Sequence, residues 1–219
     1  MERVWYVAYG SNLALERFRC YVSGGRPVGG AREYPGCRDK REPERVVSID
    51  VPGGLVFAGE SMVWGGGMAF YDAKGPGKVA CRAYLVTAEQ LGDIAAQEMR
   101  RLPGGEFARD LAGLLADVES VHTMGPGRYE TVTRLGIRDG APMFTVTHGD
   151  VSELEPVAPS ATYVRWIAAG LREAHGWDPA QIAGYLIAAA GVRDTWTVDD
   201  LEAIAACGYS DFRRAVEKG

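Results

Sequence analysis

The sequence contains few of the residues that build disulfide frameworks and metal centres. Its 219 residues include four cysteines and three histidines. No two cysteines form a Cys-x-x-Cys pair, a pattern that favours reduced thiols in the cytoplasm. The histidines stand far apart in the chain, so we expect no metal site. The residues concerned are Cys20, Cys37, Cys81 and Cys207, and His122, His148 and His175.

Long apolar runs and basic clusters are missing as well. No apolar run approaches the roughly 18 to 20 residues of a membrane span. Residues 1–3 lead straight into the first predicted strand, without the pattern of a signal peptide. The net charge is −5 and no cluster of Lys and Arg stands out, which makes nucleic acid a poor partner. We therefore expect a cytoplasmic protein that binds neither nucleic acid nor membrane.

Three common motifs of enzyme sites are absent. Residues 75–78 read Gly-Pro-Gly-Lys, but they lack the earlier glycine and the following Ser or Thr of a phosphate-binding loop. No Gly-x-Gly-x-x-Gly follows a strand, which argues against a dinucleotide site. No Gly-x-Ser-x-Gly is present, so the usual signal of a serine hydrolase is missing.

The most informative feature that is present lies near the start of the chain. The β-branched and aromatic run Val4–Tyr9 predicts a buried strand, and it breaks into Gly10-Ser11-Asn12. Gly10 allows an unusual turn. Ser11 or Asn12 is predicted to cap a short helix over Leu13–Phe18. Such a turn gathers backbone N–H groups suited to a carboxylate or amide oxygen, although an ordinary strand-to-helix connection fits equally well.

The remaining sequence predicts a mixture of strands and helices. With 47% hydrophobic residues, the chain suits one large domain or one domain with an appendage. Residues 1 to about 85 indicate strands and turns, and the chain from residue 160 onward indicates helices. In between we predict a strand at 79–86, helices at 87–101 and 107–121, and strands at 129–137 and 142–147 with a turn at 139–140.

One carboxylate stands out on the predicted helix after residue 86. Thr87 and Gln90 form a capping box that fixes the start of this helix. Its apolar stripe runs through Leu91, Ile94 and Ala95. Glu98 occupies the next position of that stripe. Burial would raise its pKa, as suits a general acid or base. The alternatives are that Glu98 pairs with an arginine, or that the stripe shifts beyond this position.

Several segments, in their order along the chain, resemble those of the γ-glutamylcyclotransferase family. They are Tyr9-Gly10-Ser11-Asn12-Leu13, Val63-Trp64-Gly65-Gly66-Gly67-Met68-Ala69, Ala83-Tyr84-Leu85-Val86, Gln97-Glu98, Gly127-Arg128-Tyr129 and Pro159-Ser160-Ala161-Thr162-Tyr163. The resemblance covers about residues 4 to 178, and the common order is more specific than any single motif.

The resemblance implies an α+β fold with a mixed, partly closed β-barrel, peripheral helices and a helical C-terminal tail. It predicts a domain over 1–178, with a helical insertion at about 102–126, and a helical C-terminal extension over 179–219. The predicted helix of the insertion is amphipathic. It would serve either as a lid or substrate selector, or simply for packing, and packing is the favoured interpretation.

The resemblance also implies a reaction. Glu98 would act as general acid/base, taking a proton from the α-amine of a γ-glutamyl amide and giving one to the departing amine. The α-amine attacks its own γ-carbonyl, releasing 5-oxoproline and an amine or amino acid, a ring closure of the acyltransferase or amidine-lyase type. Neither a cofactor nor a metal is required. The residues implied in substrate binding are Tyr9, Gly10, Ser11, Asn12, Leu13 and Tyr129.

Two alternatives stay open from the sequence. The protein would remove a γ-glutamyl protecting group from a biosynthetic intermediate, or it would bind a small metabolite without turnover. A carboxylate on an apolar helix face favours catalysis, because a binding protein has little reason to bury an unpaired charge. The expected partner is a small-molecule γ-glutamyl substrate, and the chain is expected to be a monomer or homodimer. Nothing in the sequence names the leaving group.

Overall fold

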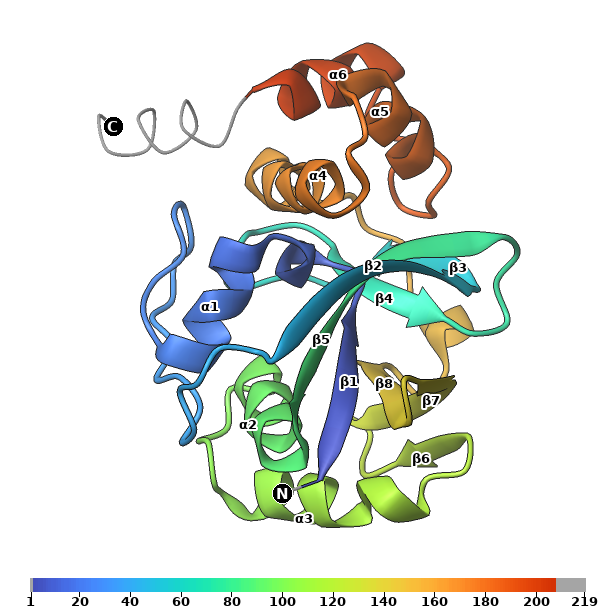
Figure 1. Ribbon diagram of the computed structural model, residues 1–219. Coiled ribbons are helices and arrows are strands. Elements are labelled where there is room, and N and C mark those ends of the chain that lie inside the picture. Colours follow the sequence, from blue (N-terminus) through green and yellow to red (C-terminus); the bar gives the residue numbers. More distant parts are fainter. Residues whose placement is uncertain (1, 208–219) are drawn as a thin grey trace.

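A six-stranded mixed sheet forms the centre of the protein, as seen in a computed structural model that describes residues 2–207 (Figure 1). Its strands are β1 (Arg3–Ala8), β2 (Arg45–Pro52), β5 (Lys78–Thr87), β6 (Val121–Thr123), β7 (Thr131–Arg138) and β8 (Ala141–Thr147). They lie in the order β2-β5-β1-β8-β7-β6. Strands β1 and β8 pair in parallel, and the other neighbours are antiparallel.

A two-stranded ribbon, β3 (Gly54–Ala58) and β4 (Met68–Asp72), lies against the end of the sheet. The backbone N–H of Tyr71 in β4 donates to Thr147 Oγ1 at 3.1 Å, and this hydroxyl donates to Tyr71 O at 2.8 Å. The expected α+β class with a mixed sheet is confirmed. Within residues 2–207 no sheet closes on itself, because β2 and β6 are the edges of the large sheet.

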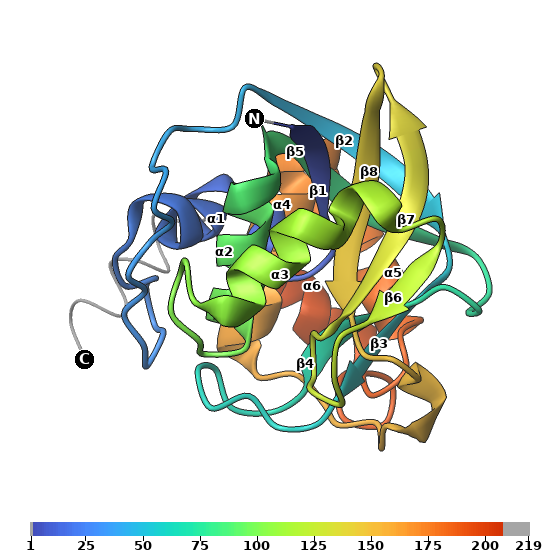
Figure 2. The same ribbon diagram turned by 90° about the horizontal axis from the view of Figure 1, so that it is seen from below.

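The helices cover both faces of the large sheet. They are η1 (Ser11–Leu13), α1 (Leu15–Ser23), α2 (Ala88–Glu98), α3 (Glu106–Leu114), η2 (Leu115–Asp117), η3 (Val151–Glu153), α4 (Ala161–His175), α5 (Pro179–Ile187) and α6 (Val198–Ala206), where η marks a short 3₁₀ helix. Helices α4, α5 and α6 lie on one side of the sheet, and α2 and α3 lie on the other (Figures 1 and 2).

The central strand β1 supplies both cores, because successive side chains of a strand point to opposite faces. Trp5, Val7 and the following Tyr9 belong to the core that the sheet shares with α4, α5 and α6. Val4, Tyr6 and Ala8 belong to the core shared with α1, α2 and α3. The uninterrupted apolar character of β1 follows from this double burial.

The capping box predicted for α2 is confirmed. Thr87 Oγ1 accepts from the backbone N–H of Gln90 at 3.0 Å, and Gln90 Oε1 accepts from the N–H of Thr87 at 3.0 Å. The cap predicted at Ser11 or Asn12 is wrong. Those residues form η1, and α1 begins after Ala14 without a side-chain cap. The side chain of Asn12 makes tertiary hydrogen bonds instead.

Helix α3, which lies in the segment predicted to be an insertion, packs against α2. A Cβ added to Gly92 of α2 would lie 2.2 Å from the backbone oxygen of Ala108 in α3, so the two helices touch where α2 has no side chain. Phe107 and Leu111 of α3 are buried in the core on that side of the sheet. This is the packing role favoured from the sequence.

The helices α5 and α6 add to the core on the other face. Ile182, Leu186 and Leu201 are fully or almost fully buried in the same cluster as the sheet residues. The proposed division of the chain at residue 178 stays a prediction, and residues 208–219 of the expected extension lie outside the described residues. All four cysteines are free thiols, as expected.

Candidate functional site

A cavity opens at the carboxyl end of β1. Its walls come from the loop 9–12, the end of α2 at Gln97 and Glu98, the start of β4 at Met68 and Ala69, Tyr163 of α4, and the segment 61–64. The cavity and its open mouth together enclose about 710 Å³ of empty space. The segment 61–64 therefore lines the cavity, one of two roles considered from the sequence.

Glu98 lies in the cavity wall, half-buried, at the last position of α2. Its Oε1 accepts a hydrogen bond from Asn12 Nδ2 at 3.0 Å. The same amide nitrogen donates to the hydroxyl of Tyr6 at 3.1 Å. The hydroxyl of Tyr21 lies near enough to this carboxyl to lower its pKa. The strand-loop motif and the helical carboxylate, 86 residues apart in the sequence, thus meet in one site.

The surroundings of Glu98 favour the neutral, protonated form of its carboxyl. Burial raises the pKa of the carboxyl, because the charged form loses hydration. The positive charge of Arg17 opposes this shift, as do the hydrogen bonds from Tyr21 and Asn12. The net direction is upward, so the carboxyl exchanges a proton more readily near neutral pH than an exposed glutamate does.

Arg17 is a buried cation beside this carboxyl. Its side chain is almost inaccessible to solvent, and Nη2 donates to the hydroxyls of Tyr21 at 3.0 Å and Tyr34 at 2.8 Å. The guanidinium carbon lies 4.3 Å and 4.4 Å from the centroids of the same two rings. Arg17 forms no ion pair in the described chain, so aromatic faces and hydroxyls take the place of a carboxylate.

Three buried polar atoms of cavity-lining residues have no hydrogen-bond partner within residues 2–207. They are Oδ1 of Asn12, and Nε and Nη1 of Arg17. A buried donor or acceptor without a partner costs about 1–3 kcal/mol. Such atoms are expected where a ligand or an ordered water completes the hydrogen bonding.

Close packing holds the loop 10–13 in place. Tyr84 of β5 donates its hydroxyl to the backbone oxygen of Asn12 at 2.6 Å. A Cβ added to Gly10 would lie 3.0 Å from the hydroxyl of Tyr163. Gly10 has a φ of −108°, so a glycine fits this position because of the limited space and not because of a left-handed backbone.

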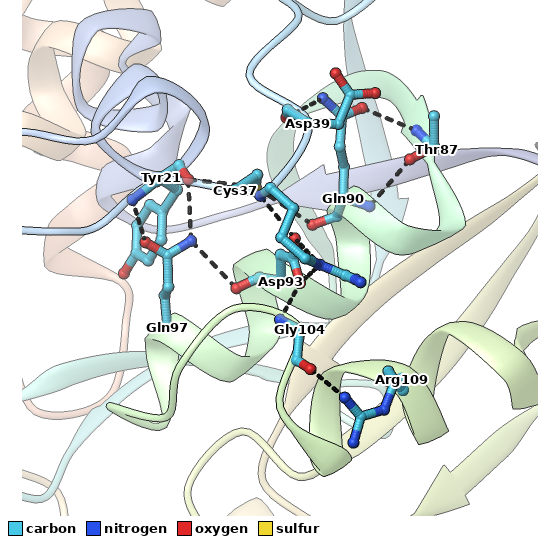
Figure 3. A network of polar contacts seen from close by, with 11 residues as sticks. Tyr21, Cys37, Asp39, Thr87, Gln90, Asp93, Gln97, Gly104 and Arg109 are labelled. Atoms are coloured by element: carbon cyan, nitrogen blue, oxygen red, sulfur yellow. Dashed lines mark hydrogen bonds and ion pairs between the residues drawn. The ribbon is translucent and has the colours of Figure 1, made fainter.

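A polar network fixes the end of α2 that carries Glu98 (Figure 3). Gln97 donates from Nε2 to the backbone oxygen of Tyr21 at 3.0 Å, and its Oε1 accepts from the backbone N–H of Gly36 at 3.1 Å. One turn earlier, the buried carboxylate of Asp93 accepts from the backbone N–H of Gly104 at 2.7 Å and ion-pairs with Arg38. The segment 24–44 and the loop before α3 are thus tied to α2.

Three further tyrosines line the cavity, and the hydroxyl of each is engaged in a hydrogen bond. Tyr9 donates to Val146 O at 2.8 Å and Tyr129 donates to Ala69 O at 2.9 Å. Tyr163 accepts from the N–H of Ala69 at 3.3 Å. Burial raises the pKa of Tyr9 and Tyr129 well above the ordinary value, and that of Tyr163 to about 12. All three are neutral at physiological pH and serve as shape and hydrogen-bonding groups.

The structure brings together six of the seven residues predicted for the site. Glu98 and the substrate-binding candidates Tyr9, Gly10, Ser11, Asn12 and Tyr129 all line the cavity. Leu13 does not line it. Its side chain is fully buried beside Gly170 of α4, where a Cβ on that glycine would come within 2.3 Å of Leu13 Cβ. The roles of all seven in substrate binding or catalysis stay predictions.

Sequence reasoning missed much of the wall, including Tyr6, Arg17, Tyr21, Arg32, Arg100 and Arg128. Arg17 and Tyr21 lie four residues apart on α1, a spacing that places them on one helix face. Nothing in the sequence indicated that this face is turned toward Glu98. Within the described chain, no group of three or more His, Cys, Asp or Glu is arranged to hold a metal ion. None of the described helices is long and apolar enough to span a membrane.

Comparison with known proteins gives likenesses of two kinds. No family model matches the sequence. A curated relative, histone deacetylase 5 of Arabidopsis thaliana, is 34% identical over 152 residues, which is 66% of this chain and 23% of that protein. The chain therefore spans about a quarter of the length of the relative it matches.

Solved structures give a likeness of fold. An uncharacterised human protein is 18% identical, with a TM-score of 0.51 over 93% of this chain and 99% of the human one. The chain shares that fold. A γ-glutamyl cyclotransferase is 16% identical with a TM-score of 0.49, with full coverage of both chains. At these identities the likeness to solved structures concerns the fold alone.

Proposed function

We propose that the protein catalyses intramolecular cyclotransfer on a γ-glutamyl amide, releasing 5-oxoproline and a free amine or amino acid. The observation that carries the proposal is the meeting of Glu98 and Asn12 in the wall of one cavity. The ring closure is intramolecular, so a site has to fold the substrate and move protons rather than supply a nucleophile.

In the proposed reaction Glu98 begins as a carboxylate. It accepts a proton from the α-ammonium of the substrate, and the freed amine attacks the γ-carbonyl carbon. A new C–N bond closes the five-membered ring, and the tetrahedral intermediate then breaks its bond to the leaving nitrogen. Glu98 returns the proton to that nitrogen, and the ring nitrogen gives up its second proton to the released amine, which leaves as an ammonium ion. The raised pKa of Glu98 supports this exchange, because the same group has to take up and release one proton in a single cycle.

The unpartnered atoms at the site support a substrate with an α-amino acid head. Oδ1 of Asn12 is an unused acceptor next to the Glu98 carboxyl, as an ammonium group would need. Arg17 has two unused donors on a positive charge, which suit a carboxylate. A zwitterionic head group presents both complements at once. The name of the plant relative belongs to a much longer protein, and we propose no deacetylation for this chain.

The test is to incubate the protein with γ-glutamyl dipeptides and γ-glutamylamines and to measure 5-oxoproline by mass spectrometry. We expect product from the wild type and a loss of at least about 100-fold in kcat for Glu98→Gln, the usual scale of a general acid/base. The matched control is Glu89→Gln, the same change at an exposed position of the same helix, which should retain activity.

Each outcome has a distinct meaning. Product from the wild type and the control, but not from Glu98→Gln, supports the reaction and the role of Glu98. Product from all three proteins refutes Glu98 as the proton carrier. Free glutamate in place of 5-oxoproline indicates hydrolysis of a γ-glutamyl group. No product, together with a ligand-dependent rise in Tm, indicates a binding protein.

A further inference from the structure

An ion pair connects the two parts of the chain that carry Glu98 and Tyr129 into the cavity. After Glu98, at the end of α2, the chain runs through α3 and returns to the sheet at β6 and β7 (Figure 2). Arg101 lies just before this excursion and Glu130 just after it, 29 residues later in the sequence, and the two side chains form an ion pair. The pair therefore closes the segment 102–126, predicted to be an insertion, at its base.

The end of α2 is a Schellman motif. The backbone N–H of Arg100 donates to Gln97 O at 3.1 Å, and that of Arg101 donates to Ala96 O at 2.8 Å, the two hydrogen bonds that define this cap. Arg100 has the left-handed backbone of the motif, with a φ of 58°, where glycine or asparagine is usual. The cap fixes the backbone of Arg101 against the last turn of α2, the turn that carries Glu98.

The side chain of Arg101 joins three parts of the structure. Its Nη2 contacts Oε1 of Glu130, and its guanidinium carbon lies 4.5 Å from the centroid of the Phe107 ring in α3. The Glu130 side chain is only 5% exposed, whereas that of Arg101 is 46% exposed. Neither residue lines the cavity. The pair therefore influences the site only through the residues that it holds in place.

The carboxylate of Glu130 fills the inside of the loop 124–130. Its Oε2 accepts from the backbone N–H of Gly127 at 2.6 Å. A Cβ added to Gly127 would lie 2.6 Å from the same oxygen, and a Cβ at Gly125 would also be too close to it. The backbone N–H of Met124 donates to Glu130 O at 2.8 Å, which closes the loop. The shape of this loop thus depends on the position of one carboxylate.

Tyr129 lies on this loop and lines the cavity. Its hydroxyl donates to Ala69 O at 2.9 Å, and its ring stacks on Phe70 with centroids 5.1 Å apart. Its backbone N–H contacts the sulfur of Met99 at 3.3 Å, and Met99 directly follows Glu98. The loop of Tyr129 therefore meets the end of α2 at two residues, Met99 and Arg101.

We infer that Arg101 and Glu130 form a positioning pair that holds Tyr129 and Glu98 in one geometry across the segment 102–126. This inference rests on the proposed function. Glu98 has to move a proton between two nitrogen atoms of the substrate, and a misplacement of 1 Å costs up to about 100-fold in rate. The pair acts on the reaction through the loop and the helix end that it connects.

The test removes one charge of the pair at a time. Arg101→Gln and Glu130→Gln should each lower kcat for γ-glutamylalanine by about tenfold and change KM little, because a displaced proton carrier affects the chemical step more than binding. The control is Thr87→Ala, which removes the cap at the other end of α2. It should lower the Tm and keep kcat at temperatures well below the Tm.

Two further variants separate positioning from a merely structural role. Arg101→Lys keeps the positive charge and should restore most of the kcat that Arg101→Gln loses. The double variant Arg101→Gln with Glu130→Gln should lose no more kcat than either single variant, because residues that act as one unit are not additive. Equal kcat in Arg101→Gln and Thr87→Ala overturns the positioning pair, and so do losses that add in the double variant.

Failure of the proposed function is distinguishable from failure of the pair. If the wild type forms no 5-oxoproline from γ-glutamylalanine or the other γ-glutamyl compounds, the cyclotransfer fails. Amide hydrogen exchange then decides the pair, because the N–H of Gly127 is bonded to Glu130. Faster exchange at Gly127 in Arg101→Gln than in Thr87→Ala supports the positioning of the loop from α2, and equal exchange overturns it.

Discussion

Gly170 of α4 provides a strong test of how the fold positions the site. A Cβ at this residue would lie 2.3 Å from Leu13 Cβ and 2.4 Å from the backbone nitrogen of Ala14. Carbon atoms in favourable contact are about 3.5–4.0 Å apart. The neighbouring backbone belongs to the loop whose Asn12 contacts Glu98, so Gly170→Ala has to push α4 and this loop apart by roughly 1 Å.

The magnitude follows from two opposing effects. Alanine in place of glycine stabilises a helix by about 1 kcal/mol. Overpacking usually costs about 1–3 kcal/mol, and here the obstacle is backbone, which cannot move aside by changing rotamer. We expect a net loss of about 1–2 kcal/mol, which corresponds to a fall in Tm of roughly 2–8 °C for a chain of this size. A 1 Å displacement near a reacting group costs up to about 100-fold in rate.

The matched variant is Gly184→Ala in α5. Gly184 is exposed, and nothing lies within 4 Å of a Cβ built there, so the same change should raise the Tm slightly and leave activity unchanged. Thermal unfolding and 5-oxoproline formation are measured on both variants. If Gly170→Ala is as stable and as active as Gly184→Ala, the close contact between α4 and the loop does not constrain the site, and the reasoning fails.

Three further predictions concern α2. The raised pKa of Glu98 means that the folded protein holds this proton more tightly than the unfolded chain does, so the free energy of unfolding falls as pH rises from the ordinary glutamate range through the raised pKa. In Tm measurements from pH 4 to 8, Glu98→Gln should gain stability relative to wild type with rising pH, by about 1.4 kcal/mol per unit of pKa shift; a constant difference would contradict a raised pKa. Asp93→Asn, which breaks the ion pair with Arg38, should cost about 2 kcal/mol in denaturant unfolding, and an unchanged midpoint would show that the pair contributes no net stability. Thr87→Ala removes the side-chain cap over Gln90 and should cost about 1 kcal/mol, with activity retained at temperatures well below the Tm.

The site combines its chemistry with a stability cost. Asn12, Arg17 and Glu98 place a raised-pKa carboxyl, a buried cation and three unpartnered atoms in one wall. Each is unfavourable for folding taken alone. The network of Asp93 and Gln97 and the close contact at Gly170 hold these groups in place. Variants that remove one of these buried polar groups should therefore be more stable and less active.

Local signals in the sequence were sufficient to predict most of the helices and strands. The capping box at Thr87 fixes the start of α2 by contacts within four residues. The turn at Asp139-Gly140 has both residues in the left-handed region, at φ 49° and 78°, as that pair favours in a hairpin. The position of Glu98 on an apolar stripe indicated an unusual carboxylate. These signals act over a few residues, and a single sequence carries them in full.

Only the tertiary structure decided which distant residues share the cavity. The periodicity of α1 does not state which face meets α2, so Arg17 and its aromatic surroundings were not predicted. For the same reason the sequence could not show that Leu13 lies outside the cavity. Leu13 directly follows Asn12 in the sequence, but its side chain packs against Gly170. The sequence also could not show that the side chain of Asn12 donates a hydrogen bond to Glu98 instead of capping the next helix. A local cap and a long-range partner compete for one amide group, and packing of the helices around the sheet decides between them.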